Sequence, residues 1–436
     1  MSLRTGVWYG NDMKLRSLTE VEDALSPYFT VAGETIGKDI TLGRTERLMA
    51  HLGDPQKKLR IIHVAGTSGK TSTTNYIAAL LHATGKKVGH TVSPHVAGLN
   101  ERVQINCQPL SEEAFCQYMS EFLPLVADAP EMPTWFEVLI AFTFWVFAEK
   151  EAVDYAVMET GLGGLQDSTN VAARADKLCV LTDIGFDHMH ILGDRLGAIA
   201  HQKAGIIHEN NVALMYEQDE EVLRVVRYWV SQQEGAELYT FAQSKLEEVY
   251  KDGFVDGLPL YQKRNWLLAW AVYRFVCRRD SIRMPSAEAV RNTQKMTVPG
   301  RMEVVEIEGK QIVLDGAHNE QKVTAMAESF RAKFPGVKPV VLMALKEGKE
   351  LKAIAPILAS LACEVIVTQF SEVQDLPFGA MDPHEIAKVL EQYKLCVAVE
   401  ADTTKAFHLF VKKAEEVGLV TGSFFLIAEL KKAGLV

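Results

Sequence analysis

The sequence predicts an α/β protein of two domains, each with a mainly parallel sheet. Short apolar runs rich in β-branched residues alternate with longer helical runs, and the composition changes once, at Thr297-Val298-Pro299-Gly300. The chain of 436 residues is also longer than a domain with a single hydrophobic core usually is. We therefore predict a larger N-terminal domain over residues 1–298 and a smaller C-terminal domain over residues 299–436.

The first domain is predicted to hold parallel strands separated by helices. Residues 1–55 are polar and helical in character, and the alternation begins after them. Because parallel strands need crossover connections, helices are expected on both faces of the sheet. Strands are expected at Leu59–Ala65, Lys87–Val92, Tyr155–Met158, Leu178–Thr182 and Val212–Tyr216. Helices are expected at Thr73–Leu81, Ser111–Phe122, Phe136–Glu149 and Glu220–Gln233.

The second domain is predicted to open with a hairpin and to continue as a Rossmann-like sheet. Val304–Glu308 and Gln311–Leu314 flank Gly309-Lys310, a pair that suits a tight turn. Helical runs separate four further expected strands, at Val340–Met343, Glu364–Thr368, Cys396–Val399 and Phe424–Ala428.

Composition and charge disfavour several classes of protein. The net charge of −10 argues against nucleic acid and anionic membranes as partners. The most apolar run, Val138–Ala148, is shorter than the roughly 20 residues of a membrane span, and we expect a buried helix there. The six cysteines form no C-x-x-C pair, and residues 1–11 lack a signal-peptide core. A cytoplasmic protein with reduced, mostly buried thiols is expected.

A phosphate-binding loop is the strongest functional motif. It lies between the first expected strand and the first expected helix of the alternating region and consists of Gly66, Thr67, Ser68, Gly69, Lys70, Thr71 and Ser72. Backbone N–H groups at such a helix start bind phosphate, Lys70 can reach the terminal phosphates, and Thr71 or Ser72 can offer a hydroxyl to Mg²⁺. The common P-loop pattern has glycine where Val64 stands. The motif predicts nucleotide binding and leaves its use open.

Polar side chains follow several expected strands of the first domain. Ser93, Glu159 and the pair Asp187-His188 each come just after a strand. Because sites in open α/β sheets form beyond the carboxyl ends of strands, we interpret these residues as Mg²⁺ ligands near Lys70. The alternative is a turn-capping Glu159 and a structural His188. From its apolar surroundings alone, Lys203 is interpreted as a lysine whose stem lies on apolar surface.

Two motifs of the second domain could also contribute. Asp315 ends a strand and could accept hydrogen bonds from a ribose or bind a cation, while Asn319 suits a helix N-cap. Arg301 follows the boundary glycine and could bind a phosphate or form an ordinary interdomain salt bridge.

This ordered set of motifs resembles the folylpolyglutamate synthase family, whose members are often bifunctional with dihydrofolate synthase, within the Mur ligase superfamily. The matching segments are His63–Lys70, Ser93-Pro94-His95, Glu101-Arg102, Thr134–Glu137, Glu159–Asn170, Gly185–His188, Ile191–Gly193, Lys203–Ile206, Arg264-Asn265, Pro299–Arg301, Asp315–Asn319 and Gly422-Ser423. The resemblance implies a first domain like the Mur ligase central domain, of the P-loop type, and a smaller C-terminal α/β domain.

The resemblance also implies residue roles. Lys70, Lys203 and His188 would be catalytic. Magnesium would be held by Ser93, Glu159, His188 and Lys203, with Lys203 carbamylated so that it carries a carboxylate. ATP would contact the phosphate loop, Asn265, Arg301 and Asp315. The acceptor would contact Thr134, Trp135, Phe136 and Glu137 on its pterin side, and His318 would contact substrate.

The resemblance implies an ATP-dependent ligase that adds L-glutamate to the carboxylate of a folate or dihydropteroate through an acyl phosphate. It also implies that the protein is a cytoplasmic monomer. Three departures from the family pattern are Leu165 in place of arginine, Thr71 in place of glycine, and Lys346-Glu347-Gly348-Lys349 in place of a more acidic segment. The first removes a charge near the acceptor and so bears on which acceptor is used. Two alternatives to the folate ligase stay open. They are a Mur-type amino-acid ligase with a non-folate acceptor and a P-loop phosphotransferase without ligation.

Overall fold

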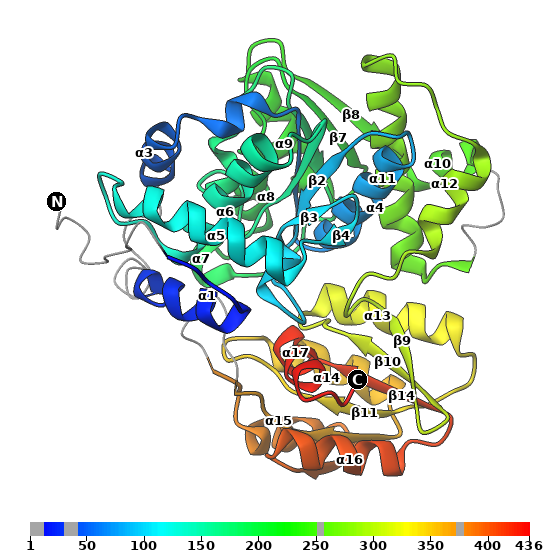
Figure 1. The fold of residues 1–436 in the computed structure, drawn as a ribbon. Helices are drawn as coiled ribbons and strands as arrows, with labels where there is room; N and C mark the ends of the chain where they lie inside the picture. The colour runs from blue at the N-terminus through cyan, green and yellow to red at the C-terminus, as the bar shows by residue number, and fades with distance from the viewer. Residues whose placement is uncertain (1–12, 30–41, 251–256, 372–378) are drawn as a thin grey trace. The chain divides into compact units, whose positions relative to one another are not determined.

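The computed structural model describes residues 13–29, 42–250, 257–371 and 379–436 (Figure 1). The chain forms two compact units. The first comprises Met1–Asp252 and Asn265–Gln294, and the second comprises Gly253–Arg264 and Lys295–Val436. The predicted division at residues 298 and 299 stays a prediction. Among the described residues, no helix is long and apolar enough to cross a membrane.

The first unit is built on an eight-stranded sheet of order β4-β3-β2-β5-β1-β6-β7-β8. The strands are β1 Ile61–Ala65, β2 Val88–Thr91, β3 Gln104–Ile105, β4 Gln108–Pro109, β5 Tyr155–Glu159, β6 Leu178–Leu181, β7 Val212–Tyr216 and β8 Glu237–Phe241. Among the strand pairs that the structure describes in this sheet, only β2–β3 and β3–β4 are antiparallel. The five predicted strands are confirmed. The polar edge strand β8 was not predicted, because its half-exposed side chains carry no strong apolar pattern.

The register of this sheet brings three loops together. In β1, Val64 pairs with Glu159 of β5, and Ala65 pairs with Leu181 of β6. The carboxyl ends of the three neighbouring strands therefore lie at the same edge. The phosphate loop, the loop after Glu159 and the loop starting at Asp183 all leave from that edge, where ligand sites of α/β sheets form.

The helices of this unit follow the predicted alternation. They are α1 Leu18–Leu25, α3 Gly43–His51, α4 Lys70–His82, α5 Glu112–Ala127, α6 Trp135–Trp145, α7 Met189–Leu192, α8 Leu196–Ala204, α9 Glu220–Ser231, α10 Gln243–Val249, α11 Leu260–Arg279 and α12 Ala287–Asn292. The long helix α11 was not predicted, and its first residues belong to the second unit. The prediction that residues 1–55 are helical holds for α1 and α3, while residues 1–12 and 30–41 lie outside the described part.

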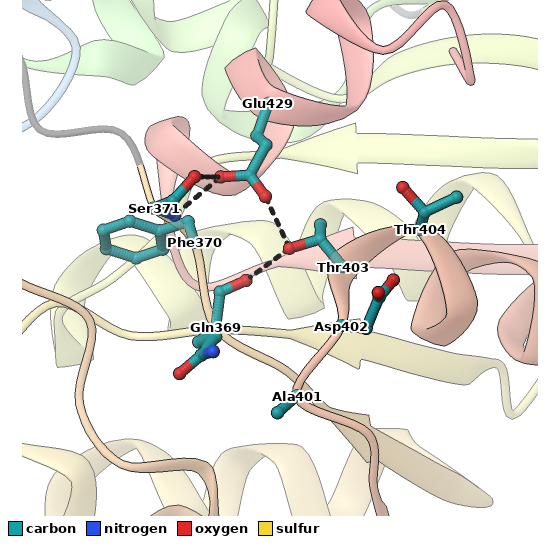
Figure 2. A pocket seen from close by; sticks show the side chains of 8 residues that line it. All are labelled: Gln369, Phe370, Ser371, Ala401, Asp402, Thr403, Thr404 and Glu429. Atoms are coloured by element: carbon teal, nitrogen blue, oxygen red, sulfur yellow. Dashed lines mark hydrogen bonds between the residues drawn. The ribbon is translucent and has the colours of Figure 1, made fainter.

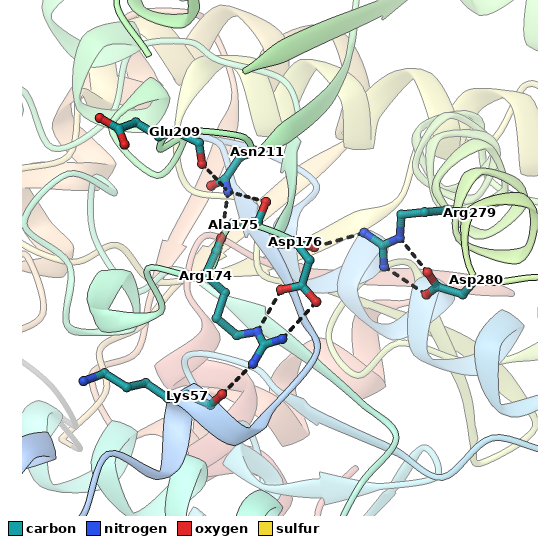
Figure 3. A network of polar contacts seen from close by, with 8 residues as sticks. All are labelled: Lys57, Arg174, Ala175, Asp176, Glu209, Asn211, Arg279 and Asp280. Atoms are coloured by element: carbon teal, nitrogen blue, oxygen red, sulfur yellow. Dashed lines mark hydrogen bonds and ion pairs between the residues drawn. The ribbon is translucent and has the colours of Figure 1, made fainter. Parts of the chain in front are cut away.

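A network of polar contacts holds the carboxyl end of α11 to the start of β6 (Figure 3). The Arg279 guanidinium donates to the carbonyl of Asp176 at 3.0 Å and pairs with Asp280, while Arg174 binds the Asp176 carboxylate through two nitrogens. Tyr155, at the start of β5, donates to Asp280 at 2.5 Å. These contacts fix the direction of the helix that carries Asn265.

The apolar run Val138–Ala148 is a buried helical segment, as predicted. It forms α6 and a following π-helical turn, Val146–Lys150. The ring of Phe142 is fully buried, with centroids 5.2 Å from Phe115, 5.3 Å from Phe122 and 6.4 Å from Trp145. This aromatic cluster forms one core of the unit.

Substituting Phe142→Ala is expected to lower the free energy of unfolding by about 3–5 kcal/mol, because it removes a buried ring and leaves a cavity. Urea denaturation of the whole chain measures the change. The matched control is Leu125→Ala on α5, whose side chain is 42% exposed, and it should cost far less. Equal losses for the two variants would contradict the burial of Phe142.

The second unit contains a six-stranded sheet of order β13-β12-β11-β14-β10-β9. The strands are β9 Glu303–Ile307, β10 Lys310–Asp315, β11 Val340–Met343, β12 Glu364–Val367, β13 Cys396–Val399 and β14 Val417–Thr421. The helices are α13 Glu320–Lys333, α14 Leu351–Leu361, α15 Pro383–Glu391, α16 Thr403–Lys413 and α17 Phe424–Lys432. In the described part of this sheet only the β9–β10 pair is antiparallel, which confirms the predicted hairpin and the Rossmann-like sheet.

One predicted strand is wrong. Phe424–Ala428 forms the start of helix α17, and the strand is β14, just before it. Gly422 has a φ of +94°, and the Ser423 hydroxyl accepts a hydrogen bond from the N–H of Phe425. This cap starts a helix directly after the strand. A short apolar run is compatible with a buried helix or a buried strand, and only packing decides between them.

The six cysteines are free thiols. Cys116, Cys179 and Cys277 are buried, whereas Cys363 and Cys396 are exposed. The prediction of mostly buried thiols therefore holds for the first unit and is wrong for the second.

Candidate active site

The phosphate loop connects β1 to α4 and is held in place by its neighbours. The N–H groups of Thr67 and Ser68 donate to the carbonyl of Asp183 at 2.8 and 3.1 Å, and the Thr67 hydroxyl donates to the carbonyl of Gly185 at 2.9 Å. Gly69 caps α4 with a φ of +88°. A β-carbon at Gly69 would lie 2.4 Å from Oδ1 of Asn265, so the loop needs glycine there. The start of α4 thus presents the N–H groups that bind phosphate.

Two lysines meet on one carbonyl of this loop. Lys70 Nζ donates to the carbonyl oxygen of Gly66 at 3.1 Å, and Lys203 Nζ donates to the same oxygen at 2.9 Å. Lys203 lies at the end of α8 and is only 4% exposed. The interpretation of Lys203 as a lysine that extends its amine from apolar surface to water is therefore wrong. Its amine is buried against the phosphate loop, which a residue-by-residue view of the sequence does not show.

Glu159 joins two other predicted site residues. Glu159 is the last residue of β5, and its side chain is buried. Its Oε1 accepts a hydrogen bond from the Thr71 hydroxyl at 2.8 Å, and its Oε2 accepts one from the Ser93 N–H at 3.1 Å. The structure thus brings Glu159, Thr71 and Ser93 together beside Lys70. A residue that only capped its own turn would not make these contacts, which join Glu159 to two other segments of the chain.

His188 follows Asp187 directly. It is half-buried at the start of α7 with a φ of +51°, and its Nε2 lies 3.8 Å from Oδ1 of Asp187. Asp187 and His188 follow Gly185, whose carbonyl binds Thr67 of the phosphate loop.

The oxygen-rich set around Glu159 suits magnesium better than a transition metal. Within the described ranges, no three His, Cys, Asp or Glu side chains gather as a metal-binding group. Magnesium does not require one, because it usually takes one or two carboxylates and fills its other positions with water and phosphate oxygens. The buried Glu159 carboxylate with the Thr71 hydroxyl matches that preference.

The glycine-rich loop after Glu159 packs on α8. A β-carbon at Gly164 would lie 2.7 Å from the carbonyl oxygen of Gln202, and Leu165 donates its N–H to the same carbonyl at 2.7 Å. Asp167 accepts from the N–H of Leu162 and from Thr169, whose hydroxyl also contacts the ring of the buried His63. Burial raises the pKa of Asp167. Asp167 and His63 lie in two of the segments that match the family, Glu159–Asn170 and His63–Lys70, and their contacts hold this loop in position.

The predicted acceptor segment divides into accessible and buried side chains. Thr134 and Phe136 are half-buried, and Phe136 packs so closely on Gly161 that a β-carbon there would lie 2.4 Å from its ring. Trp135 is buried, with the Arg102 guanidinium 4.8 Å from its ring centroid. Phe136 therefore borders the glycine-rich loop, whereas Trp135 lies in the core.

Glu137 is engaged within the protein. It forms a capping box with Thr134 at the start of α6, and its carboxylate accepts from Arg44 Nε at 2.6 Å and from the Thr45 hydroxyl at 3.3 Å. The Arg44 contact could not be found by local pattern, since 93 residues separate the two positions. Glu137 orders the segment that presents Phe136.

In the second unit, Asp315 organises its own neighbourhood. The buried carboxylate accepts from the Tyr261 hydroxyl at 2.6 Å and from the N–H groups of Met302 and Ala317 at 3.0 Å. Burial raises the pKa of Asp315, and the Tyr261 hydrogen bond and the Arg301 charge oppose this shift. Arg301 lies 3.7 Å from the ring centroid of Phe424.

The loop after Asp315 leads into α13, where Asn319 is the N-cap as predicted. Its Oδ1 accepts from the N–H of Lys322 at 2.9 Å. His318 precedes the cap, with Nδ1 2.8 Å from the carbonyl oxygen of Gly316 and Nε2 3.0 Å from Lys322 Nζ. Lys322, in the first turn of α13, was not selected from the sequence.

A separate pocket of about 300 Å³ lies in the second unit (Figure 2). It is lined by Gln369, Phe370, Ser371, Ala401, Asp402, Thr403, Thr404 and Glu429. The Glu429 carboxylate accepts from Ser371 and from the Thr403 hydroxyl, so the polar groups of its wall bind one another. None of the predicted site residues lines it.

The phosphate loop with its two lysines and a buried carboxylate, together with a Rossmann-like second unit, defines a protein of the Mur ligase type. The model for the family described as "Dihydrofolate synthetase, C-terminal domain" matches residues 301–433. The chain is 33% identical to the dihydrofolate synthase/folylpolyglutamate synthase of Bacillus subtilis, over 90% of this chain and 94% of that protein. It belongs to the dihydrofolate synthase/folylpolyglutamate synthase family.

Other relatives agree with this assignment. The dihydrofolate synthetase of Saccharomyces cerevisiae is 29% identical over 90% of this chain and 97% of its own length. The structure of Mycobacterium tuberculosis folylpolyglutamate synthase complexed with ADP matches with a TM-score of 0.82 and 27% identity, covering 95% of this chain and 98% of that one. E. coli FolC in complex with DHPP and ADP has a TM-score of 0.78 at 23% identity, with coverage of 96% and 97%, and supports the fold.

Proposed function

We propose that this protein is an ATP-dependent amide ligase that joins L-glutamate to the carboxylate of a folate or of dihydropteroate. The observation that carries the proposal is the meeting of Lys70 and Lys203 on the Gly66 carbonyl, beside the Glu159 carboxylate. Family membership supports the choice of substrates. Phosphoryl transfer to an acid needs positive charge beside a phosphate-binding helix start, and in this proposal Lys70 supplies it, with Lys203 and Glu159 beside it as metal ligands.

The chemistry explains why ATP is needed. A carboxylate does not form an amide unaided, because its carbon is a poor electrophile and oxide is a poor leaving group. Transfer of the γ-phosphoryl group to the carboxylate oxygen gives an acyl phosphate. The amine nitrogen of glutamate then attacks the carbonyl carbon, the carbon–oxygen bond to phosphate breaks, and phosphate leaves. In this proposal the N–H groups at the start of α4 bind the phosphates, and Lys70 neutralises the charge that develops during transfer.

Magnesium would be held by Glu159, with Ser93, His188 and Lys203 as the further proposed ligands. When bound, it neutralises phosphate charge and aligns the transferred group. Carbamylation of Lys203 is part of the proposal, because it would turn a buried amine into an oxygen ligand. Thr71 keeps the Glu159 carboxylate oriented toward the loop.

We further propose that Thr134 and Phe136 contact the pterin side of the acceptor. The buried side chains of Trp135 and Glu137 would hold this segment in place. The remaining proposed contacts are those of Asn265, Arg301 and Asp315 with ATP and of His318 with substrate. The protein is proposed to act as a monomer in the cytoplasm. Sedimentation velocity of the whole chain tests the monomer.

An acceptor screen tests the proposed function. The whole chain is incubated with ATP, Mg²⁺ and L-glutamate together with tetrahydrofolate, dihydropteroate or a nucleotide-linked muramyl acid, and products are identified by mass. A product heavier by one glutamyl residue is expected with a pteridine acceptor, with ADP formed in equal amount. Glutamylation of the muramyl acid alone would favour a different Mur-type ligase. ADP formed without any amino acid would favour a phosphotransferase.

A further inference from the structure

Helix α3 joins two segments of the first unit that border the proposed acceptor site. Arg44, in its first turn, donates from Nε to Oε2 of Glu137 at 2.6 Å, in the segment that carries Phe136. The hydroxyl of Thr45, the next residue, lies 3.2 Å from that of Ser168, just after the glycine-rich loop. These two contacts bridge 93 and 123 residues of sequence. A single helical turn therefore holds both segments.

The hydroxyl protons along this path have a defined direction. A carboxylate only accepts, so the contact of 3.3 Å between Thr45 Oγ1 and Oε1 of Glu137 uses the Thr45 proton. The contact of 3.2 Å between the two hydroxyls must then use the proton of Ser168. Ser168 thus donates to Thr45, and Thr45 donates to Glu137. All three side chains are buried, where a hydrogen bond meets little competition from water.

Arg44 neutralises a carboxylate that is otherwise deep in the protein. The Glu137 side chain is only 6% exposed, and that of Arg44 is 16% exposed. Oε2 of Glu137 also accepts from the N–H of Thr134 at 2.6 Å, as one half of the capping box of α6. Removing the guanidinium would leave this buried carboxylate without its ion-pair partner, which is an unfavourable state. We expect the carboxylate then to turn toward water and the capping box to open.

The two segments held by α3 meet at Phe136. Its ring packs so closely on Gly161 of the glycine-rich loop that a β-carbon there would lie 2.4 Å from the ring. The loop is held to the same helix a second time, because the N–H of Leu42, the N-cap of α3, donates to Oε1 of Gln166 at 3.0 Å. The position of the ring on the loop therefore depends on how α3 holds both sides.

We propose that Arg44 is a positioning residue for the acceptor. By holding Glu137, it sets where the Phe136 ring lies against the glycine-rich loop, and this arrangement recognises the flat pterin end of the acceptor. The inference rests on the proposed function. Because the proposed role of Arg44 is to place the pterin end, its loss is expected to weaken acceptor binding and to leave ATP binding and the chemical step almost unchanged. Folate and dihydropteroate share the pterin end, so both should be affected alike.

The first experiment measures this hold without substrate. Hydrogen exchange of the whole chain is followed by mass spectrometry in a peptide covering residues 132–140. Arg44→Met is expected to raise exchange there about tenfold, because the Thr134 N–H donates to the carboxylate that Arg44 holds, whereas Arg44→Lys should stay close to wild type. The matched control is Arg47→Met, on the same helix, whose side chain is 56% exposed. Unchanged exchange in Arg44→Met, or the same rise in Arg47→Met, overturns the inference.

The second experiment asks whether the acceptor depends on this hold. Arg44→Met is expected to raise KM for tetrahydrofolate and for dihydropteroate about tenfold, with kcat and KM for ATP within about twofold of wild type. Arg47→Met should match the wild type in all four constants. Thr45→Val keeps the ion pair and removes the hydroxyl between Glu137 and Ser168, so it should raise the acceptor KM about threefold. This variant carries the test if Arg44→Met does not fold.

The outcomes separate this inference from the function on which it rests. An acceptor KM that stays at the wild-type value in both variants overturns the role of Arg44 in acceptor binding. An equal rise in KM for ATP overturns it too, because it would show a general loosening of the unit. Absence of any ligation by the wild type contradicts the proposed function itself, whereas the exchange result does not depend on ligation.

Discussion

Lys70→Ala is expected to lower glutamate-dependent phosphate release about 10³-fold and to leave the chain folded. Lys70 begins α4, and its ammonium reaches over the loop to the Gly66 carbonyl at 3.1 Å. The group that neutralises the transferred phosphoryl charge is worth several kcal/mol in the transition state, because charge develops there in a pre-organised site. Steady-state phosphate release with saturating acceptor and glutamate measures the effect.

The folded state provides the control for this prediction. Lys70 is half-buried and has no place in the apolar core, so urea denaturation of the variant should resemble that of the wild type. Lys86→Ala is the matched substitution, since Lys86 lies just beyond the same helix and pairs with Asp154 at the surface. It should keep full activity. A Lys70→Ala enzyme that retained a tenth of the wild-type rate would show that the loop lysine is not needed for phosphoryl transfer.

Lys203→Ala is expected to reduce ligation about 10²-fold by removing a residue that we propose as a metal ligand. Lys203 is 4% exposed, its amine lies 2.9 Å from the Gly66 carbonyl, and Lys70 donates to the same oxygen. Two ammonium groups on one carbonyl repel each other, so conversion of the Lys203 amine to a carbamate would relieve repulsion and supply an oxygen ligand. Ligation rates at several Mg²⁺ concentrations should show weaker apparent metal affinity in the variant.

The carbamate itself is open to direct observation. Wild-type protein equilibrated with ¹³C-bicarbonate should show a carbamate carbon signal, and Lys203→Ala should lack it. Lys177→Met is the matched control, because Lys177 is a second buried lysine of the same unit, at the opposite end of β6 from Asp183. A signal that disappears in Lys177→Met and persists in Lys203→Ala would place the modification elsewhere.

What the sequence determines by itself are features whose causes lie within a few neighbouring residues. The phosphate loop is one, since the strand, the glycines and the helix start adjoin each other. Other such features are the hairpin of β9 and β10, the Asn319 cap and the buried helix α6. Local hydrogen bonds and apolar periodicity suffice for these elements, because they depend on residues separated by only a few positions. The family resemblance came from the order of such local motifs.

The tertiary structure decided what depends on distant parts of the chain. Lys203 lies 137 residues from Gly66, and Glu137 lies 93 residues from Arg44, so neither partner is visible in a local pattern. The hydrogen bond from the Tyr261 hydroxyl to Asp315 is likewise invisible in a local pattern. So is the fact that Val417–Thr421 forms strand β14 while Phe424–Lys432 forms helix α17. In each case the sheet register or the packing of a helix selects one of several locally acceptable arrangements. The role of a buried polar side chain therefore follows from its partner, and only the folded chain supplies that partner.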